Sequence, residues 1–187
     1  ERFEQSKYAT TADYLADLNL IHDTLCEANA SLTAHEWIFP LIRLAQIFGL
    51  HFASLDVRNN SEAHDAAAAQ LFAKVGIPDG ENFPTWSEEK RREFLVAELS
   101  NPRPFLTRYE EAGDDADNIL AYFRLLATHL RKRGPDCLGQ LIISMTRSAS
   151  DILLVQLLCR ESGLAKLHSN GKWCYRLPVS PLFETGE

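Results

Sequence analysis

The chain has 187 residues, of which 45% are hydrophobic and 24% are charged. These proportions are ordinary for a folded globular domain and exclude disorder along the whole chain. Its 19 basic and 26 acidic side chains leave a formal net charge of −7. This balance argues against broad electrostatic binding to nucleic acid or to acidic membranes.

No apolar run has the length that a membrane span needs, and no charged and then apolar leader opens the sequence. We therefore predict a soluble, cytoplasmic protein with no nucleic-acid or membrane partner. The four cysteines are far apart and contain no C-x-x-C pair, which favours packed, reduced thiols over a zinc or redox site. The sequence opens with Glu1 rather than Met, so we expect a piece of a longer protein.

Two helices are predicted first. Residues 11–30 place apolar side chains at helical spacing, with Thr10 or Thr11 as the N-cap. Residues 36–49 predict a second helix, kinked or begun near Pro40. Its high apolar content predicts burial on more than one side.

Strand and helix patterns then alternate. Apolar segments typical of strands occupy residues 50–58, 138–146 and 173–184. Helical patterns occupy residues 61–77, 87–100, 119–134 and 149–164. The N-cap positions hold Ser61, Ser87, and Ser148 or Ser150, and an acidic loop over 110–118 precedes the third of these helices.

This order predicts a helix-rich α/β architecture with about three parallel strands. Three strands with so much helix form a thin sheet for a free-standing domain but suit part of a larger barrel. We therefore expect one segment over residues 1–187, with a helical lead-in over 1–49 and β/α units over 50–187.

Polar side chains gather at the downstream ends of all three strands. The groups are Arg58, Asn59 and Asn60; Thr146, Arg147 and Ser148; and Glu184 and Thr185. Ligands of β/α folds bind where parallel strands end. An arginine there presents a fork of donors for phosphate or carboxylate, and a carboxylate there can hold a hard divalent cation.

Simpler interpretations exist for each of these residues. Arg58 can pair with the nearby Asp56, and Asp151 can be a first-turn acid that favours the helix dipole. The histidines His22, His64 and His129 are more often packed or surface groups than ligands or bases. No nucleophile and base stand at a recognisable spacing, so we predict no catalytic residue.

Three stretches resemble the phosphoenolpyruvate carboxylase family. FGLHFASLDVRNNSEAH is similar to FGL-x-L-x-x-LD-[IV]-RQ-x-S-x-x-H, and LIISMTRSASDILLVQLLCRESGL is similar to ISM-[AT]-x-[ST]-x-SD-[VI]-L-x-V-x-L-L-x-[KR]-E-x-G. LPVSPLFET is similar to V-[VAS]-PLFET. Their order and spacing agree, and weaker similarity in YLADLNLIHDTL, SEEKRREFLVAEL and RPFL extends the resemblance over nearly the whole chain.

The resemblance implies a large (β/α)8 barrel of the TIM type that carboxylates phosphoenolpyruvate with bicarbonate, giving oxaloacetate and phosphate. It implies Mg²⁺ or Mn²⁺ as cofactor and a homotetramer of full-length chains. Arg58 resembles the arginine that binds the substrate phosphate, and Glu184 resembles one of two metal carboxylates. Asn59 stands where the family usually has Gln, a mild change because the amide is kept.

Other family features have no counterpart in this sequence. The second metal carboxylate, the catalytic histidine, and the glycine-rich and arginine-rich loops are missing, so we predict that the isolated chain is inactive. Two alternatives stay open: a non-catalytic helical scaffold in which Arg58 forms only an internal salt bridge, and a phosphate-ligand-binding module of the same fold.

Overall fold

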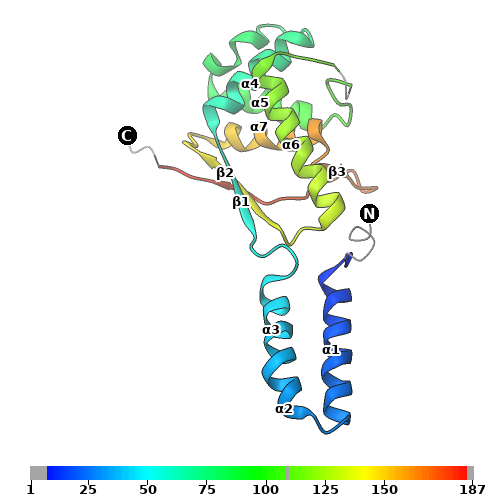
Figure 1. Cartoon of the computed structure of the whole chain (residues 1–187). Coiled ribbons are helices and arrows are strands. Elements are labelled where there is room, and N and C mark those ends of the chain that lie inside the picture. Colours follow the sequence, from blue (N-terminus) through cyan, green and yellow to red (C-terminus); the bar gives the residue numbers. More distant parts are fainter. Residues whose placement is uncertain (1–7, 108–109, 185–187) are drawn as a thin grey trace. The chain divides into compact units, whose positions relative to one another are not determined.

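A computed structural model describes residues 8–107 and 110–184 (Figure 1). The chain divides into two compact units, with the boundary between Ser54 and Leu55.

The first unit is helical. It contains α1 (Thr11–Glu27), α2 (Ser31–Thr33), a π-helical segment (Ala34–Ile38) and α3 (Phe39–Phe48). The predicted first helix is confirmed, with Thr10 as its N-cap. The Thr10 side chain accepts a hydrogen bond from the Asp13 backbone N–H at 3.1 Å, and the Asp13 carboxylate accepts one from the Thr10 N–H at 3.0 Å. This reciprocal capping box satisfies two donors at the helix end.

The predicted irregularity near Pro40 is confirmed, and it takes the form of a π turn. Pro40 has no N–H, and its ring crowds the carbonyl four residues earlier. The wider π-helical turn over Ala34–Ile38 stands directly before this proline and accommodates it. Gly49, at φ 56°, then ends α3.

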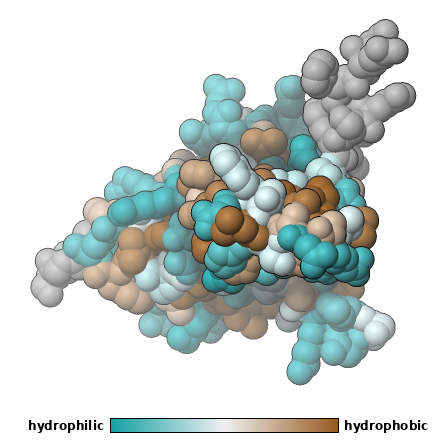
Figure 2. Space-filling model, turned by 60° about the horizontal axis from the view of Figure 1, so that its bottom comes forward, coloured by the Kyte–Doolittle hydropathy of each residue, from teal (hydrophilic) through white to brown (hydrophobic). Residues whose placement is uncertain are grey.

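The predicted burial of this second helix on more than one side is wrong. Only Ile42 and Ala45 of α3 are buried, and they pack against Leu18 of α1. Trp37 is 73% exposed and Ile47 is 62% exposed. Figure 2, in which the end with α2 is turned toward the reader, shows hydrophobic surface between hydrophilic side chains. A two-helix hairpin has room for only one buried seam, so the other apolar side chains remain uncovered.

The second unit has the predicted parallel sheet. Its strands β1 (Leu55–Asn60), β2 (Leu138–Ser144) and β5 (Val179–Pro181) pair in parallel in the order β1-β2-β5. The helix-rich α/β fold class is therefore confirmed. In Figure 1, β1 leads into α4 and β2 leads into α7.

Two strand boundaries differ from the prediction. The first strand begins at Leu55 rather than at residue 50, and Phe52 has a φ of 67°, which no strand residue adopts. The segment 173–184 holds two strands, because β4 (Trp173–Tyr175) forms an antiparallel pair with β3 (Ala165–Leu167) before β5 begins.

The four predicted helices of this unit are all present. They are α4 (Ser61–Lys74), α5 (Glu88–Leu99), α6 (Asp114–Arg133) and α7 (Ala149–Ser162), and a 3₁₀ helix (Gly80–Thr85) lies in the loop before α5. Ser87 and Ser148 are the N-caps of α5 and α7, as predicted. The predicted acidic loop is wrong in its second half, because Asp114 opens α6, where carboxylates favour the helix dipole.

The cap of α4 is also different from the prediction. The Asn60 side chain accepts hydrogen bonds from the N–H groups of Glu62 and Ala63, at 2.6 and 3.3 Å. Ser61 is instead the first helical residue, and its hydroxyl donates to the Met145 carbonyl at 2.8 Å. Ser61 thus joins the ends of β1 and β2.

Strand alternation fixes which face meets the core. Val57, Leu141 and Ile143 are buried together with residues of the helices, whereas Arg58 points to the opposite face of β1.

Within the described residues, no helix has the length and apolar content to cross a membrane.

Candidate functional site at the strand ends

The structure brings the two predicted site residues together. Arg58 is paired with Ile142 in the sheet, and Ile142 with Ser180. From β1, the Arg58 side chain reaches over β2 to Glu184, which follows β5. Its Nη2 group donates to Oε1 of Glu184 at 2.9 Å and to Oε2 at 3.1 Å. The Arg58 side chain is 56% exposed and that of Glu184 is 38% exposed, so the pair is open to solvent.

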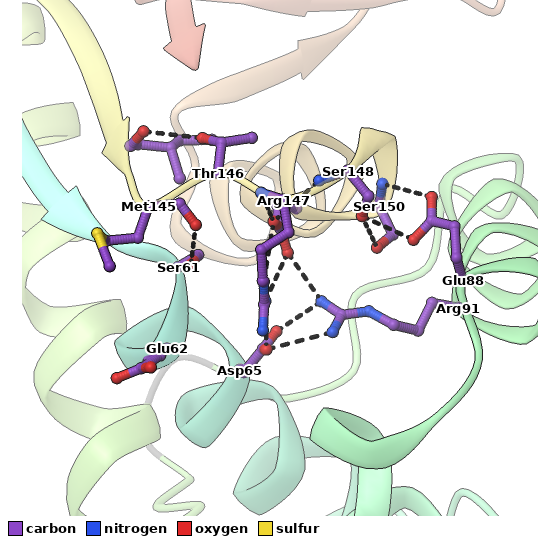
Figure 3. Close-up of polar contacts among 12 residues, drawn as sticks. Ser61, Glu62, Asp65, Glu88, Arg91, Met145, Thr146, Arg147, Ser148 and Ser150 are labelled. Atoms are coloured by element: carbon purple, nitrogen blue, oxygen red, sulfur yellow. Dashed lines mark hydrogen bonds and ion pairs between the residues drawn. The ribbon is translucent and has the colours of Figure 1, made fainter. Parts of the chain in front are cut away.

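Two residues of the β2 end hold this pair. Nε of Arg58 donates to the hydroxyl of Ser144. Oε1 of Glu184 also accepts a hydrogen bond from the Met145 backbone N–H at 3.2 Å. Met145 has a φ of 57°, a left-handed conformation that turns the chain where the strand ends. Figure 3 shows its link to Ser61 at the start of α4.

The suggested pairing of Arg58 with Asp56 is wrong. Asp56 instead accepts a hydrogen bond from the Gln140 backbone N–H at 3.1 Å. Asp56 and Arg58 are two residues apart on the strand, so their side chains share one face of the sheet. Arg58 nevertheless bonds to Glu184, whose two carboxylate oxygens both accept from its Nη2 group. Arg58 therefore does form an internal salt bridge, but its partner is Glu184 and not Asp56.

The polar residues that follow β2 do not face Arg58. Arg147 belongs to an ion cluster with Asp65, Arg91 and Asp151. Figure 3 labels Asp65, Arg91 and Arg147 of this cluster. The other three side chains are buried, whereas that of Arg147 is 44% exposed. Arg91 donates to Asp65 at 2.6 Å and to Asp151 at 3.1 Å. Arg147 donates to the same two carboxylates at 2.6 and 2.8 Å.

The ion cluster balances two positive with two negative charges. Burial alone raises the pKa of Asp151, but hydrogen bonds from the Arg147 side chain and backbone, and the charges of Arg147 and Arg91, hold it below its usual value. The same bonds raise the pKa of Arg147. Every charge has a partner of opposite sign, so the cluster joins α4, α5 and α7.

Asp151 is an acid in the first turn of α7, as the simple interpretation predicts, and it is also a member of the ion cluster. Asp151 completes a capping box with Ser148, and Ser148 also donates to Glu88 at 2.7 Å. Burial raises the pKa of Glu88, but hydrogen bonds from Ser150 and Ser148 outweigh this and lower it. The Thr146 hydroxyl donates to the Ile143 carbonyl at 2.8 Å. Thr185 lies outside the described residues.

His64 is packed, as predicted. It is 3% exposed, and within the described part of the chain neither ring nitrogen has a hydrogen-bond partner. Burial lowers its pKa to about 4, so the ring is neutral at pH 7. It borders a cavity of about 10 Å³, the space that one water molecule needs, which Val57, Asn59 and Phe123 also line. His64 lies on the helix side of the sheet, away from Arg58.

The donor set for a metal ion is incomplete here. Among residues 8–107 and 110–184, no three His, Cys, Asp or Glu side chains lie close enough to hold one. Glu184 is the carboxylate at the strand ends, and Mg²⁺ demands a near-octahedral set of oxygens. The described residues therefore do not form a metal site by themselves.

Sequence comparisons agree with the motifs at these strand ends. The family model for phosphoenolpyruvate carboxylase matches residues 1–187. The chain is 37% identical over 179 residues to the phosphoenolpyruvate carboxylase of Roseiflexus castenholzii, covering 96% of this chain and 18% of that protein. It is 36% identical over 184 residues to that of Rhodopseudomonas palustris, covering 98% and 19%.

A third relative has similar identity and coverage. The phosphoenolpyruvate carboxylase of Mycobacterium avium is 35% identical over 181 residues, which are 96% of this chain and 19% of that protein. The chain thus spans about a fifth of the length of the curated relatives that it matches. With the motifs, the sheet and the match over its whole length, the chain belongs to the phosphoenolpyruvate carboxylase family.

Proposed function

We propose that the chain acts as part of a phosphoenolpyruvate carboxylase, a carbon-carbon lyase that forms oxaloacetate and phosphate from phosphoenolpyruvate and bicarbonate. In this proposal Arg58 binds the substrate phosphate. The observation that supports it is the position of Arg58: a half-exposed guanidinium at the carboxyl end of β1, beside Ser144 and Glu184. Arginine matches phosphate through paired N–H donors.

The chemistry gives Arg58 a defined task. Bicarbonate attacks phosphorus, the bond from phosphorus to the enol oxygen breaks, and carboxyphosphate and an enolate form. The bond from the carboxyl carbon to the bridging oxygen of carboxyphosphate then breaks, which releases phosphate and carbon dioxide, and the enolate carbon attacks the carbon dioxide to give oxaloacetate. Negative charge on the phosphoryl oxygens is stabilised where fixed N–H donors already point at them. Arg58 can supply such donors once its Nη2 group leaves Glu184.

Further parts of the proposal concern the whole protein. They are a complete (β/α)8 barrel, a homotetramer, a cytoplasmic location, carbon dioxide fixation that supplies the tricarboxylic acid cycle, and a Mg²⁺ or Mn²⁺ ion. Glu184 is proposed as one carboxylate ligand of that ion, and the described residues do not provide the rest of its ligands. The 187-residue chain alone is expected to form no oxaloacetate when given phosphoenolpyruvate, bicarbonate and manganese.

Titration calorimetry with phosphoenolpyruvate tests the site in the 187-residue chain. Arg58→Ala is expected to weaken binding about tenfold or more, because charge-assisted hydrogen bonds to the phosphate are lost. Its thermal midpoint should stay near that of wild type, since an exposed ion pair stabilises little. Arg43→Ala is the matched control, because Arg43 bonds only to Gln46 on α3 within the described residues.

The scaffold alternative is favoured by one observation, the ion pair of Arg58 with Glu184. It predicts the opposite pattern in the same experiment. Arg58→Ala would then lower the thermal midpoint and leave phosphoenolpyruvate binding equal to that of Arg43→Ala. That result would reject the phosphate site.

A further inference from the structure

From the contacts of Arg58 we infer that Ser144 is a positioning residue, whose hydroxyl holds the guanidinium so that its outer N–H groups face a phosphate. The inference rests on the proposed role of Arg58 and extends it to a residue that lies inside the apolar run of β2. Ser144 acts through Arg58 and is not proposed to touch the substrate.

The sheet register places Ser144 where it can do this. Arg58 is opposite Ile142, and Ser144 stands two residues further along β2, so all three side chains share one face. Ser144 is 7% exposed at the last position of the strand. Its backbone is fixed by pairing with Asn60 of β1. The hydroxyl is therefore a rigid acceptor beside a long, mobile side chain.

The bond to Ser144 uses the one donor that a phosphate does not need. A guanidinium has five N–H groups, one on Nε and two on each Nη. Ser144 occupies Nε, and Glu184 occupies Nη2. Among the described residues, the Nη1 group has no hydrogen-bond partner. An anion can thus bind Nη1 and Nη2 while the bond from Nε to Ser144 persists.

Fixing Nε sets the plane of the guanidinium. An exposed arginine that is free to rotate loses conformational freedom when it binds an anion, whereas a side chain already held in place loses less. The hydroxyl of Ser144 therefore improves anion affinity without contacting the anion. A purely structural role for Ser144 predicts no such dependence on Arg58.

A double-mutant cycle measured by titration calorimetry separates the two roles. Ser144→Ala is expected to weaken phosphoenolpyruvate binding about tenfold in the wild-type chain, which corresponds to about 1.4 kcal/mol. In the Arg58→Lys background, which has no Nε–H donor at this place, Ser144→Ala should have no further effect. Ser144→Thr keeps the hydroxyl and should restore binding. Ser180→Ala is the matched control, because Ser180 on β5 donates to Gln140 instead.

A second readout needs no ligand. The ¹H–¹⁵N resonance of Arg58 Nε–H should exchange slowly with water in the wild-type chain and in Ser180→Ala, and rapidly in Ser144→Ala. An Nε–H resonance that Ser144→Ala leaves unchanged overturns the inference. So does an equal loss of affinity from Ser144→Ala in both Arg58 backgrounds, since Ser144 then acts independently of Arg58.

Different results reject the phosphate site at Arg58 and the positioning role of Ser144. If wild type binds phosphoenolpyruvate and Ser144→Ala binds it equally well, the positioning role is rejected while the phosphate site stands. If neither wild type nor Ser180→Ala binds it, the phosphate site itself is rejected, and the positioning role with it.

Discussion

Arg58 and Glu184 neutralise each other at the carboxyl ends of β1 and β5. Both side chains are partly exposed, and such pairs stabilise a protein by at most about 1 kcal/mol. A phosphate that carries more negative charge than a carboxylate can therefore displace Glu184 from Arg58. The ion pair is compatible with a phosphate site and also competes with it.

This competition gives a prediction for Glu184→Gln. In buffer with a chelator and no divalent metal, the variant is expected to bind phosphoenolpyruvate several-fold more tightly than wild type, because it removes the carboxylate that competes for Nη2 and its negative charge. Calorimetry measures the change. Glu62→Gln makes the same charge change on the exposed first turn of α4. Equal affinities in the two variants would contradict the competition.

His64 gives a prediction for stability against pH. Its folded-state pKa of about 4 lies below the ordinary 6.5 because the ring is buried, although the charges of Asp65 and Asp151 act in the opposite direction. Below pH 6.5 the unfolded chain binds a proton that the folded chain excludes. Stability should therefore fall as the pH drops from 6.5 to 4, by about 3 kcal/mol in all, and the contribution should level off below pH 4.

Urea unfolding between pH 7 and pH 4 measures this dependence. His64→Gln should flatten it, because the variant has no imidazole to protonate. His22→Gln is the control, since His22 lies at the surface beside Asp23. A pH profile that His64→Gln leaves as steep as that of wild type would contradict the assignment.

For single residues, the sequence predicts those whose place follows from the strand pattern around them. The strand patterns place Arg58 and Glu184 at strand ends, and parallel strands end at one edge of a sheet. Their proposed roles come from the resemblance to phosphoenolpyruvate carboxylases. Ser144 is missed because a lone hydroxyl inside an apolar run gives no signal of its own. Asp65 and Arg91 are missed because their contact depends on how α4 and α5 pack, which no spacing along the chain encodes.

The helices of the second unit are joined by charge as well as by apolar packing. Arg91 of α5 bonds to Asp65 of α4 and to Asp151 of α7, and its guanidinium also lies 4.5 Å from the ring centroid of Phe83. One side chain thus contacts three elements. Because these hydrogen bonds are buried, the carboxylates of Asp65 and Asp151 would lose a partner that water cannot replace if Arg91 were removed.

Arg91→Ala is expected to lower the free energy of unfolding by about 3–5 kcal/mol, because it leaves buried carboxylates without their full set of partners. Chemical denaturation measures the loss. Arg92→Ala removes the same charge from the exposed side of α5 and should change stability by less than about 0.5 kcal/mol. A loss for Arg91→Ala no larger than that for Arg92→Ala would show that the cluster does not stabilise the fold.

The sequence predicts best those helices and strands that combine several sequence signals. The helices α1, α5 and α7 combine apolar periodicity with an N-cap side chain, and their starts are predicted correctly. The strands β3 and β4 have three residues each, too few for a periodic pattern. The cap of α4 is misassigned because Asn60 and Ser61 are adjacent and both are good cap residues.

For the whole molecule, the most unusual feature is the uncovered apolar surface of the helical unit. Single exposed apolar residues are common, but neighbouring ones on one short hairpin are not. Those with large exposed side chains on the hairpin include Leu20, Leu32, Trp37, Leu41, Leu44 and Ile47. The sequence predicts the apolar helix, and it does not predict how little of it the chain buries.

The 187-residue chain is therefore expected to bind a hydrophobic dye such as anilinonaphthalene sulfonate at pH 7. Replacing Trp37 and Ile47 by Gln should lower the dye fluorescence at least about twofold, because it removes exposed apolar area. Leu125→Gln is the control, since it removes an exposed leucine of α6, away from the hairpin sequence. Equal fluorescence from the control and the double variant would contradict a dye site on the hairpin.

The most direct test of the phosphate site follows the Arg58 guanidinium resonances by NMR while phosphoenolpyruvate is added to the chain. Pyruvate, which has no phosphate, is the comparison ligand, and Arg43 is the internal control. We predict saturable shifts of the Arg58 Nε and Nη resonances with phosphoenolpyruvate and much smaller ones with pyruvate, while those of Arg43 stay in place. Shifts that are the same for both ligands, or that are absent from Arg58, would contradict the account.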